Sequence, residues 1–141
     1  MRRGRVRREA KLELLGGVPL FAGCSKSELR WVAGISTEES FEAGAEVIRE
    51  GEMGWDFFVI VEGQAEVRRK RRKVGTMGPG DFFGEIALVA DMPRTATIVA
   101  STDLLVLTIT DVDFRELVLD QPKIAQKVLR SLGARIAADS R

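Results

Sequence analysis

Eight glycines punctuate the middle of the chain, over residues 41–110, and leave only short segments between them. These segments are rich in β-branched and aromatic residues. Short β-rich segments separated by glycines are typical of an all-β sandwich or roll. The glycines are Gly44, Gly51, Gly54, Gly63, Gly75, Gly78, Gly80 and Gly84.

Six segments of this region are predicted strands. A tight hairpin is expected at Gly63, because only glycine adopts a positive φ at no steric cost. Phe57 and Phe58 point to opposite faces of one predicted strand, so only one of them is expected in the core. The predicted strands are residues 46–49, 56–61, 64–69, 73–77, 96–100 and 104–110.

The N-terminal end of the chain has helical periodicity. Val6, Ala10 and Leu14 recur every four residues, which predicts a short amphipathic helix that ends before Gly16. Because this end is also basic, residues 1–17 are predicted to form a basic N-terminal helical arm.

Further helices are predicted on both sides of the strand-rich region. Ser25 and Glu28 form a capping box that begins a helix running to about Gly34. Thr110 suits the N-cap of a later helix, and Pro122 suits the first position of the last one. An apolar stripe on the last helix, expected to pack on the roll or against a second copy, comprises Ile124, Val128, Leu132 and Ile136.

These elements predict a mostly β fold with flanking helices: a jelly-roll-like β-roll with N-terminal helices and two C-terminal helices. After the arm, residues 18–119 are expected to form the roll with its flanking helices. Residues 120–141 are expected to form the C-terminal helix.

The composition excludes several classes of enzyme. Histidine and tyrosine are both absent, which removes the commonest general base and the commonest metal ligand. A lone cysteine, Cys24, cannot form an internal disulfide and agrees with a reducing cytoplasm. No apolar run approaches the roughly twenty residues of a membrane span, and no secretory signal is visible. Carboxylate acid/base pairs and a nucleophilic Cys24 remain open alternatives, and the expectation is a cytoplasmic, non-enzymatic protein without a metal or cofactor.

Basic residues are concentrated in two places, although the net charge is only +1. Residues 1–11 and 68–73 each hold six Lys and Arg, which leaves 10 bases against 20 acids in the rest of the chain. The acidic remainder argues against a broad nucleic-acid-binding face. The run 68–73 is predicted to be a solvated hairpin tip.

The segment of residues 80–97 is the candidate site, because a helix-like apolar run interrupts the strands there and an arginine follows it. Gly84 allows a ligand to approach the backbone, and the free amides of the following turn suit an anion. Arg94 is placed to form a charge-assisted pair with that anion, and Glu85 to accept from a neighbouring hydroxyl. An anion beside a hydroxyl describes a ribose phosphate.

On these residues the sequence resembles the cyclic-nucleotide-binding domains of the catabolite activator protein, cyclic-nucleotide-dependent kinases and gated channels. The resemblance covers about residues 18–138. The matching segments are Gly51-Glu52-x-Gly54, Phe58-Val59-Ile60-x-Glu62-Gly63, Gly78-Pro79-Gly80-Asp81-Phe82, Phe83-Gly84-Glu85-Ile86-Ala87-Leu88 and Arg94-Thr95-Ala96.

The resemblance assigns roles to individual residues. It implies that Arg94 pairs with the cyclic phosphate and that Glu85 binds the ribose 2′-hydroxyl. It also implies backbone amide donors near Ile86, Ala87 and Ala96, beside Gly84. An apolar pocket for the purine is implied to include Val67, Val74 and Met77.

The same resemblance suggests which base is read. In kinase members of the family, a threonine directly after the phosphate-binding arginine goes with a preference for cyclic GMP. Thr95 has that position here. Channel and bacterial relatives weaken this rule, so both nucleotides are expected to bind, with cyclic AMP as the natural ligand.

The predicted function is that of a sensor that binds cyclic AMP or cyclic GMP and transmits binding to its C-terminal helices. A homodimer or an effector protein is the expected partner of the last helix. The alternative is the ligand-binding domain of a catabolite-activator-type transcription regulator or of a larger signalling protein. No direct nucleic-acid-binding domain is expected in this chain.

Overall fold

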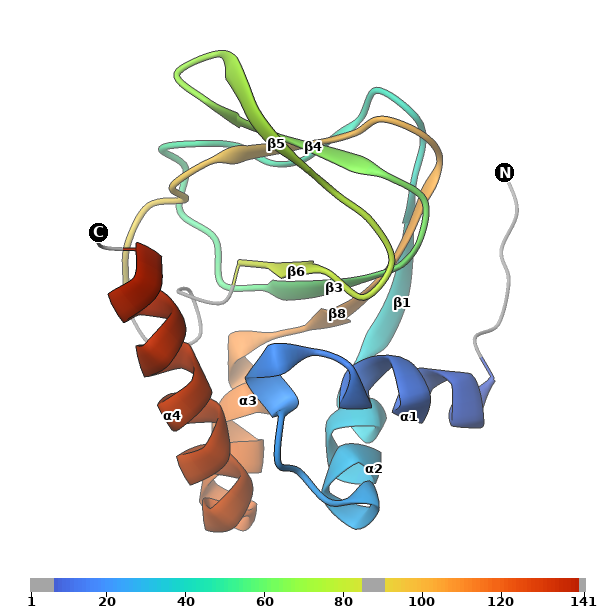
Figure 1. The fold of residues 1–141 in the computed structure, drawn as a ribbon, viewed down its shortest axis with the longest axis vertical. Coiled ribbons are helices and arrows are strands. Elements are labelled where there is room, and N and C mark those ends of the chain that lie inside the picture. The colour runs from blue at the N-terminus through green and yellow to red at the C-terminus, as the bar shows by residue number, and fades with distance from the viewer. Residues whose placement is uncertain (1–6, 85–90, 140–141) are drawn as a thin grey trace.

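The strands form two antiparallel sheets in the computed structural model, which describes residues 7–84 and 91–139 (Figure 1). One sheet has the order β1-β8-β3-β6, made of Thr37–Phe41, Leu104–Ile109, Phe57–Glu62 and Phe82–Phe83. The other has the order β2-β7-β4-β5, made of Glu46–Ile48, Thr97–Ala100, Ala65–Arg69 and Arg72–Met77. The predicted β-roll with flanking helices is confirmed, and each of the six predicted strands is present to within one residue at either end.

Strands β1 and β6 were not predicted from the sequence. β1 has the sequence Thr-Glu-Glu-Ser-Phe and lies at the edge of its sheet, where it pairs only with β8. Because an edge strand has one unpaired side and this one is largely solvated, it lacks the apolar alternation of a half-buried strand. β6 has only two residues, and its pairing with β3 gives it a strand conformation.

The hairpin expected at Gly63 is absent. β3 and β4 belong to different sheets, so the chain crosses from one sheet to the other between them. Gly63 does have the expected positive φ, 95°, and a Cβ there would lie 2.2 Å from the carbonyl oxygen of Asp103. The glycine is therefore required by a close backbone approach rather than by a hairpin.

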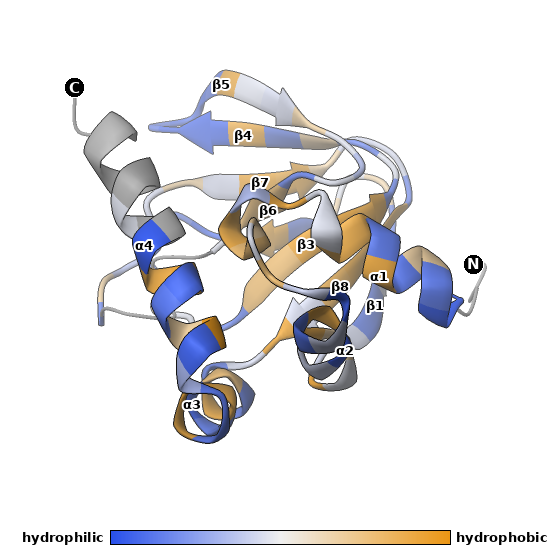
Figure 2. Cartoon of the chain, turned by 60° about the horizontal axis from the view of Figure 1, so that its bottom comes forward, coloured by the Kyte–Doolittle hydropathy of each residue, from blue (hydrophilic) through white to orange (hydrophobic). Residues whose placement is uncertain are grey.

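Both Phe57 and Phe58 are buried, which corrects the expectation that only one would be. Phe58 lies between the two sheets, where its ring stacks on that of Phe83 at 4.9 Å. Phe57 points the other way, into a second core between the β1-β8-β3-β6 sheet and the helices, and contacts Phe21 edge-on. Figure 2 shows the resulting hydrophobic colour along β3 and β8. The central strands are covered on both faces.

The helices gather at one end of the roll (Figure 1). Their bounds are Arg8–Gly16 for α1, Pro19–Phe21 for the 3-10 turn η1, Lys26–Gly34 for α2, Asp111–Asp120 for α3 and Pro122–Asp139 for α4. None of the helices in the described ranges combines the length and apolar character needed to cross a bilayer.

The helix predicted from Val6, Ala10 and Leu14 is present as α1, but of these three residues only Leu14 is seen to pack against the core. Ala10 is exposed and Val6 lies outside the described residues, whereas Leu12 and Leu15 are buried. These two leucines belong to the same core as Phe57, so α1 packs against the other helices and the sheet.

The predicted helix ends are confirmed. Ser25 Oγ accepts from the amide of Glu28 at 3.1 Å, and Glu28 Oε1 accepts from the amide of Ser25 at 2.8 Å. Thr110 caps α3 by accepting from the amide of Asp113 at 3.1 Å. Lys127 on α4 donates to Glu28 on α2 at 2.7 Å, which joins the two helices.

The apolar stripe of α4 faces the core where it is described. Ile124 and Val128 are completely buried among the other helices and the sheet. The side chains of Leu132 and Ile136 lie outside the described ones. The first half of the stripe therefore packs onto its own domain.

Candidate functional site

Arg94 is the most buried charged side chain of the candidate site, with 9% of its surface exposed. Its guanidinium passes between two glycines that have no side chain to obstruct it. A Cβ on Gly54 would lie 2.6 Å from Arg94 Nε, and a Cβ on Gly84 would lie 2.9 Å from Arg94 Nη1. Both glycines therefore shape the space that the guanidinium occupies.

The backbone of Arg94 is held by the segment that precedes Gly54. The amide of Arg94 donates to the carbonyl of Glu52 at 2.8 Å, and the amide of Gly51 donates to the carbonyl of Arg94 at 2.9 Å. These two bonds hold Arg94 beside the segment that leads into β3, although Arg94 and that segment are far apart in the sequence.

The guanidinium has a neutral partner but no ion pair among the described residues. Arg94 Nη2 donates to the backbone carbonyl of Asp56 at 3.0 Å, and the Arg94 Cζ lies 6.0 Å from the ring centre of Phe58. Burial lowers the pKa of Arg94, and the Asp56 carboxylate partly offsets this. Since a buried charge is costly without a counter-charge, this position suits an anion.

Asp56 connects the arginine electrostatically with the start of α3. Burial raises the pKa of Asp56, and the nearby carboxylates of Glu39 and Asp111 raise it further, whereas Arg94 lowers it. Asp111 is the first residue of α3. A change at Arg94 therefore alters the electrostatic environment of a group close to this helix.

A cleft of about 500 Å³ lies against these residues. It is lined by both apolar and charged groups, and it reaches from Arg94 to the first turn of α3. The lining comprises Val47, Ile48, Arg49, Glu52, Met53, Gly54, Trp55, Asp56, Phe58, Arg94, Thr110, Asp111 and Val112.

Only part of the predicted phosphate site falls within the described residues. Gly84 has the positive φ, 84°, that favours glycine, and the chain approaches it closely from Asp56. Ala96 is buried and Thr95 is exposed, directly after Arg94. The remaining predicted residues, Glu85, Ile86 and Ala87, lie outside the described residues.

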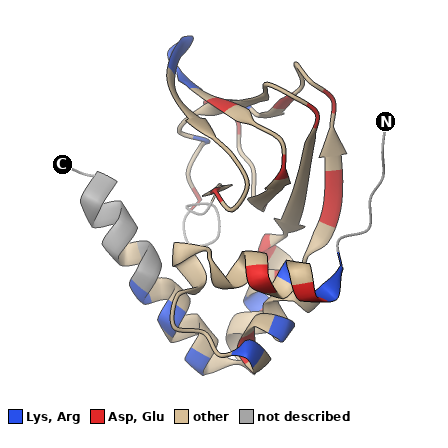
Figure 3. Ribbon diagram, turned by 45° about the vertical axis from the view of Figure 1, so that its right-hand side comes forward, with Lys and Arg blue, Asp and Glu red and all other residues tan. Residues whose placement is uncertain are grey.

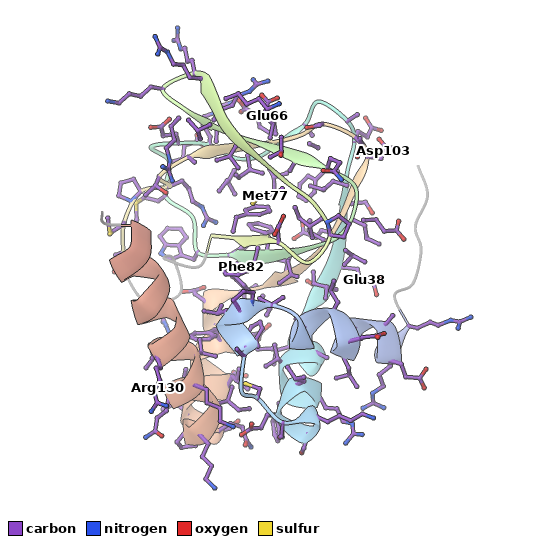
Figure 4. All side chains as sticks on the ribbon, viewed as in Figure 1. Glu38, Glu66, Met77, Phe82, Asp103 and Arg130 are labelled. Atoms are coloured by element: carbon purple, nitrogen blue, oxygen red, sulfur yellow. The ribbon has the colours of Figure 1, made fainter. Side chains whose placement is uncertain are left out.

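The three residues predicted to line the purine pocket lie on β4 and β5. Val67 and Met77 pack against the core between the sheets, and Figure 4 shows Met77 in that space. Val74 is the extra residue of a β-bulge, next to Gly75, which pairs with Val67. It is 54% exposed, so it adds an apolar surface that its own chain does not cover.

Sequence reasoning did not assign roles to Gly54, Asp56 and Phe58. All three contact or flank the Arg94 guanidinium. The motif Gly51-Glu52-x-Gly54 was the available signal, but the sequence alone did not show what approaches its last glycine.

Comparisons with known proteins place the chain among cyclic nucleotide-binding domains. Residues 38–121 match the family model described as "Cyclic nucleotide-binding domain". The chain is 35% identical over 119 residues to a cyclic nucleotide-gated potassium channel of Rhizobium etli, which covers 84% of this chain and 33% of the channel. It is 40% identical over 111 residues to a cAMP-dependent protein kinase regulatory subunit of Yarrowia lipolytica, which covers 75% of this chain and 30% of the subunit.

The fold is shared with solved structures. A cyclic nucleotide-binding domain from Methylobacillus flagellatus superimposes with a TM-score of 0.82 at 24% identity, over 95% of this chain and 78% of that one. The chain spans about a third of the length of the two curated relatives.

Proposed function

The chain belongs to the cyclic nucleotide-binding domain family, and from that premise we propose that it is a regulatory sensor for a cyclic purine ribonucleotide. The proposed ligand is cyclic AMP, with cyclic GMP as a second ligand. The sensor is proposed to act in the cytoplasm, to catalyse no reaction and to require no cofactor.

The observation that carries the proposal is the buried Arg94 with a carbonyl as its partner and no acidic partner within 4.0 Å among the described residues. A cyclic phosphate has one negative charge and oxygens that accept from a guanidinium fork. Binding the phosphate would give Arg94 a counter-charge. The desolvation free energy of the arginine is lost during folding, so little of it is added on binding.

The other parts of the nucleotide are assigned by the sequence motif. Glu85 is proposed to accept from the ribose 2′-hydroxyl, the one hydroxyl that a 3′,5′-cyclic phosphate leaves free. Amides near Ile86, Ala87 and Ala96 are proposed to complete the phosphate site. Val67, Val74 and Met77 are proposed to contact the purine, and the exposed surface of Val74 supports this because a ligand would cover it.

Signal transmission is proposed to run from Arg94 through Asp56 to α3. The phosphate would compete with the Asp56 carbonyl for the guanidinium. Movement of the guanidinium would change the charge balance between Asp56 and Asp111, at the N-terminus of α3. Because α3 packs on α4, a shift of one helix moves the other, and this pair is proposed to contact a homodimer partner or an effector.

The test is calorimetric titration with cyclic AMP and cyclic GMP. Arg94→Ala should lower affinity by roughly 2 to 5 kcal/mol, about thirtyfold to several thousandfold, because a desolvated phosphate charge loses its partner. The matched control is Arg49→Ala, because Arg49 lines the same cleft but is exposed and ion-paired with Glu46 at 2.5 Å. Unchanged affinity in Arg94→Ala, or an equal loss in Arg49→Ala, would refute the site.

A further inference from the structure

The turn between β4 and β5 carries a cluster of cations that the nucleotide site does not use. Arg69 and Arg72 are the last and first residues of these strands, and Lys70 and Arg71 form the two-residue turn. All four are exposed. Figures 1 and 3 show this basic tip, residues 69–72, projecting away from α1, α2 and α3.

Among the described residues, the side chains of the basic tip form no ion pair, whereas the bases beside the tip do. Arg68 and Lys73 both pair with Glu66. Within the described part of the chain, no carboxylate lies within 4.0 Å of a cation of the basic tip. Arg69 and Arg72 face each other across the strands, and opposed like charges destabilise a sheet.

The backbone of the turn is also unfavourable for its sequence. Lys70 has a φ of 53° and Arg71 a φ of 67°, so both are left-handed. A two-residue turn of this type favours Asn-Gly, because residues with longer side chains are strained there. Strained backbone and repelling charges at one place indicate that the basic tip serves a purpose other than stability.

The tip is held in place and borders a hollow. The amide of Lys70 donates to Glu50 Oε1 at 2.9 Å, which ties the turn to the end of β2. The hollow has a volume of about 710 Å³. It is lined by one threonine, by two acids that already have partners and by four bases: Thr97, Glu46, Glu50, Arg49, Arg68, Lys70 and Arg71.

We propose that the basic tip and this hollow bind a short acidic segment of a partner protein. Arginine forks match carboxylates, and the hollow gives side chains of an extended peptide a concave surface. A long duplex or a membrane surface fits less well, because the chain outside its two basic segments has 20 acids and 10 bases, and an extended polyanion would be repelled by it.

The test is titration of the whole chain at low salt with a short fluorescent peptide of four glutamates, one for each cation of the basic tip. Substituting Lys70→Asn together with Arg71→Gly should weaken binding at least tenfold. The same substitutions should raise the midpoint of thermal unfolding, because they relieve the left-handed strain. Cyclic nucleotide affinity should not change, so a failure of this proposal is separate from a failure of the nucleotide site.

The control is Lys123→Gln together with Arg130→Gln, which removes two positive charges from exposed positions of α4. The proposal is supported if this control binds the peptide as the unmodified chain does. It is overturned if the control loses as much affinity as the tip variant, or if the unmodified chain does not bind the peptide. Tighter binding to a 20-base-pair duplex or to phosphatidylserine vesicles than to the peptide would also overturn it.

Discussion

Replacing Gly54 with alanine tests how closely the fold is fitted around Arg94. The new Cβ would lie 2.6 Å from Arg94 Nε, 2.7 Å from Nη2 and 2.9 Å from Cζ. Relaxing these contacts to an ordinary separation of about 3.5 Å requires the guanidinium to move by about 1 Å. Such a shift breaks the 3.0 Å bond to the Asp56 carbonyl and displaces the group proposed to bind the phosphate.

The expected loss of affinity is one charge-assisted hydrogen bond from the displaced guanidinium to the phosphate, about 1.5 to 3 kcal/mol. Cyclic nucleotide affinity should therefore fall about tenfold to a hundredfold by calorimetric titration. The free energy of unfolding should also fall, because the displaced guanidinium loses its bond to the Asp56 carbonyl, although alanine at Gly54 does not strain a backbone that lacks a positive φ. Titration well below the unfolding midpoint of the variant keeps it folded, so the affinity loss then reports the position of Arg94.

The matched control is Gly34→Ala, at the end of α2. Gly34 also lacks a positive φ, and its Cβ would meet nothing within 4 Å. Affinity in this variant should equal that of the unmodified chain. If Gly54→Ala binds the nucleotide as tightly as Gly34→Ala, the packing of Arg94 against Gly54 does not matter for binding and the argument is wrong.

Three other outcomes are expected. Thr95→Ala should lower the affinity for cyclic GMP by at most about tenfold and leave that for cyclic AMP nearly unchanged, since one hydroxyl contributes about 0.5 to 1.5 kcal/mol. Equal losses of affinity for both nucleotides in calorimetric titration would assign Thr95 to the phosphate or the backbone. Ile124→Ala should cost about 2 to 5 kcal/mol of unfolding free energy, measured in urea, because Ile124 is fully buried. Hydrogen bonds from Lys127 and Ser25 lower the pKa of Glu28. The ionised carboxylate therefore stabilises the fold at pH values above the ordinary glutamate pKa, and this stability is lost as the pH falls through the lowered pKa. Lys127→Gln should make acid unfolding curves shallower in that range, and unchanged curves would show that the pair does not couple α2 to α4.

The sequence by itself determined the features whose causes lie within a few residues. The capping box at Ser25 and Glu28, the N-cap at Thr110 and the start of α4 at Pro122 each depend on a local backbone bond or on a fixed φ. The positive φ of Gly63 was predicted as well, but its cause is the close approach of the Asp103 backbone and not a local hairpin. The order of the glycines and the residues around Gly84 also carry the family resemblance, which requires no structure.

The tertiary structure decided which segments meet, because strand pairing and core packing join residues that are distant in the chain. No local pattern shows that β3 pairs with β8 and β6 instead of β4, and therefore that Phe57 and Phe58 enter two different cores. The same holds for the close contact of Gly54 with Arg94. That contact follows from two long-range backbone bonds, and its consequence for the site depends on distances that a sequence does not contain.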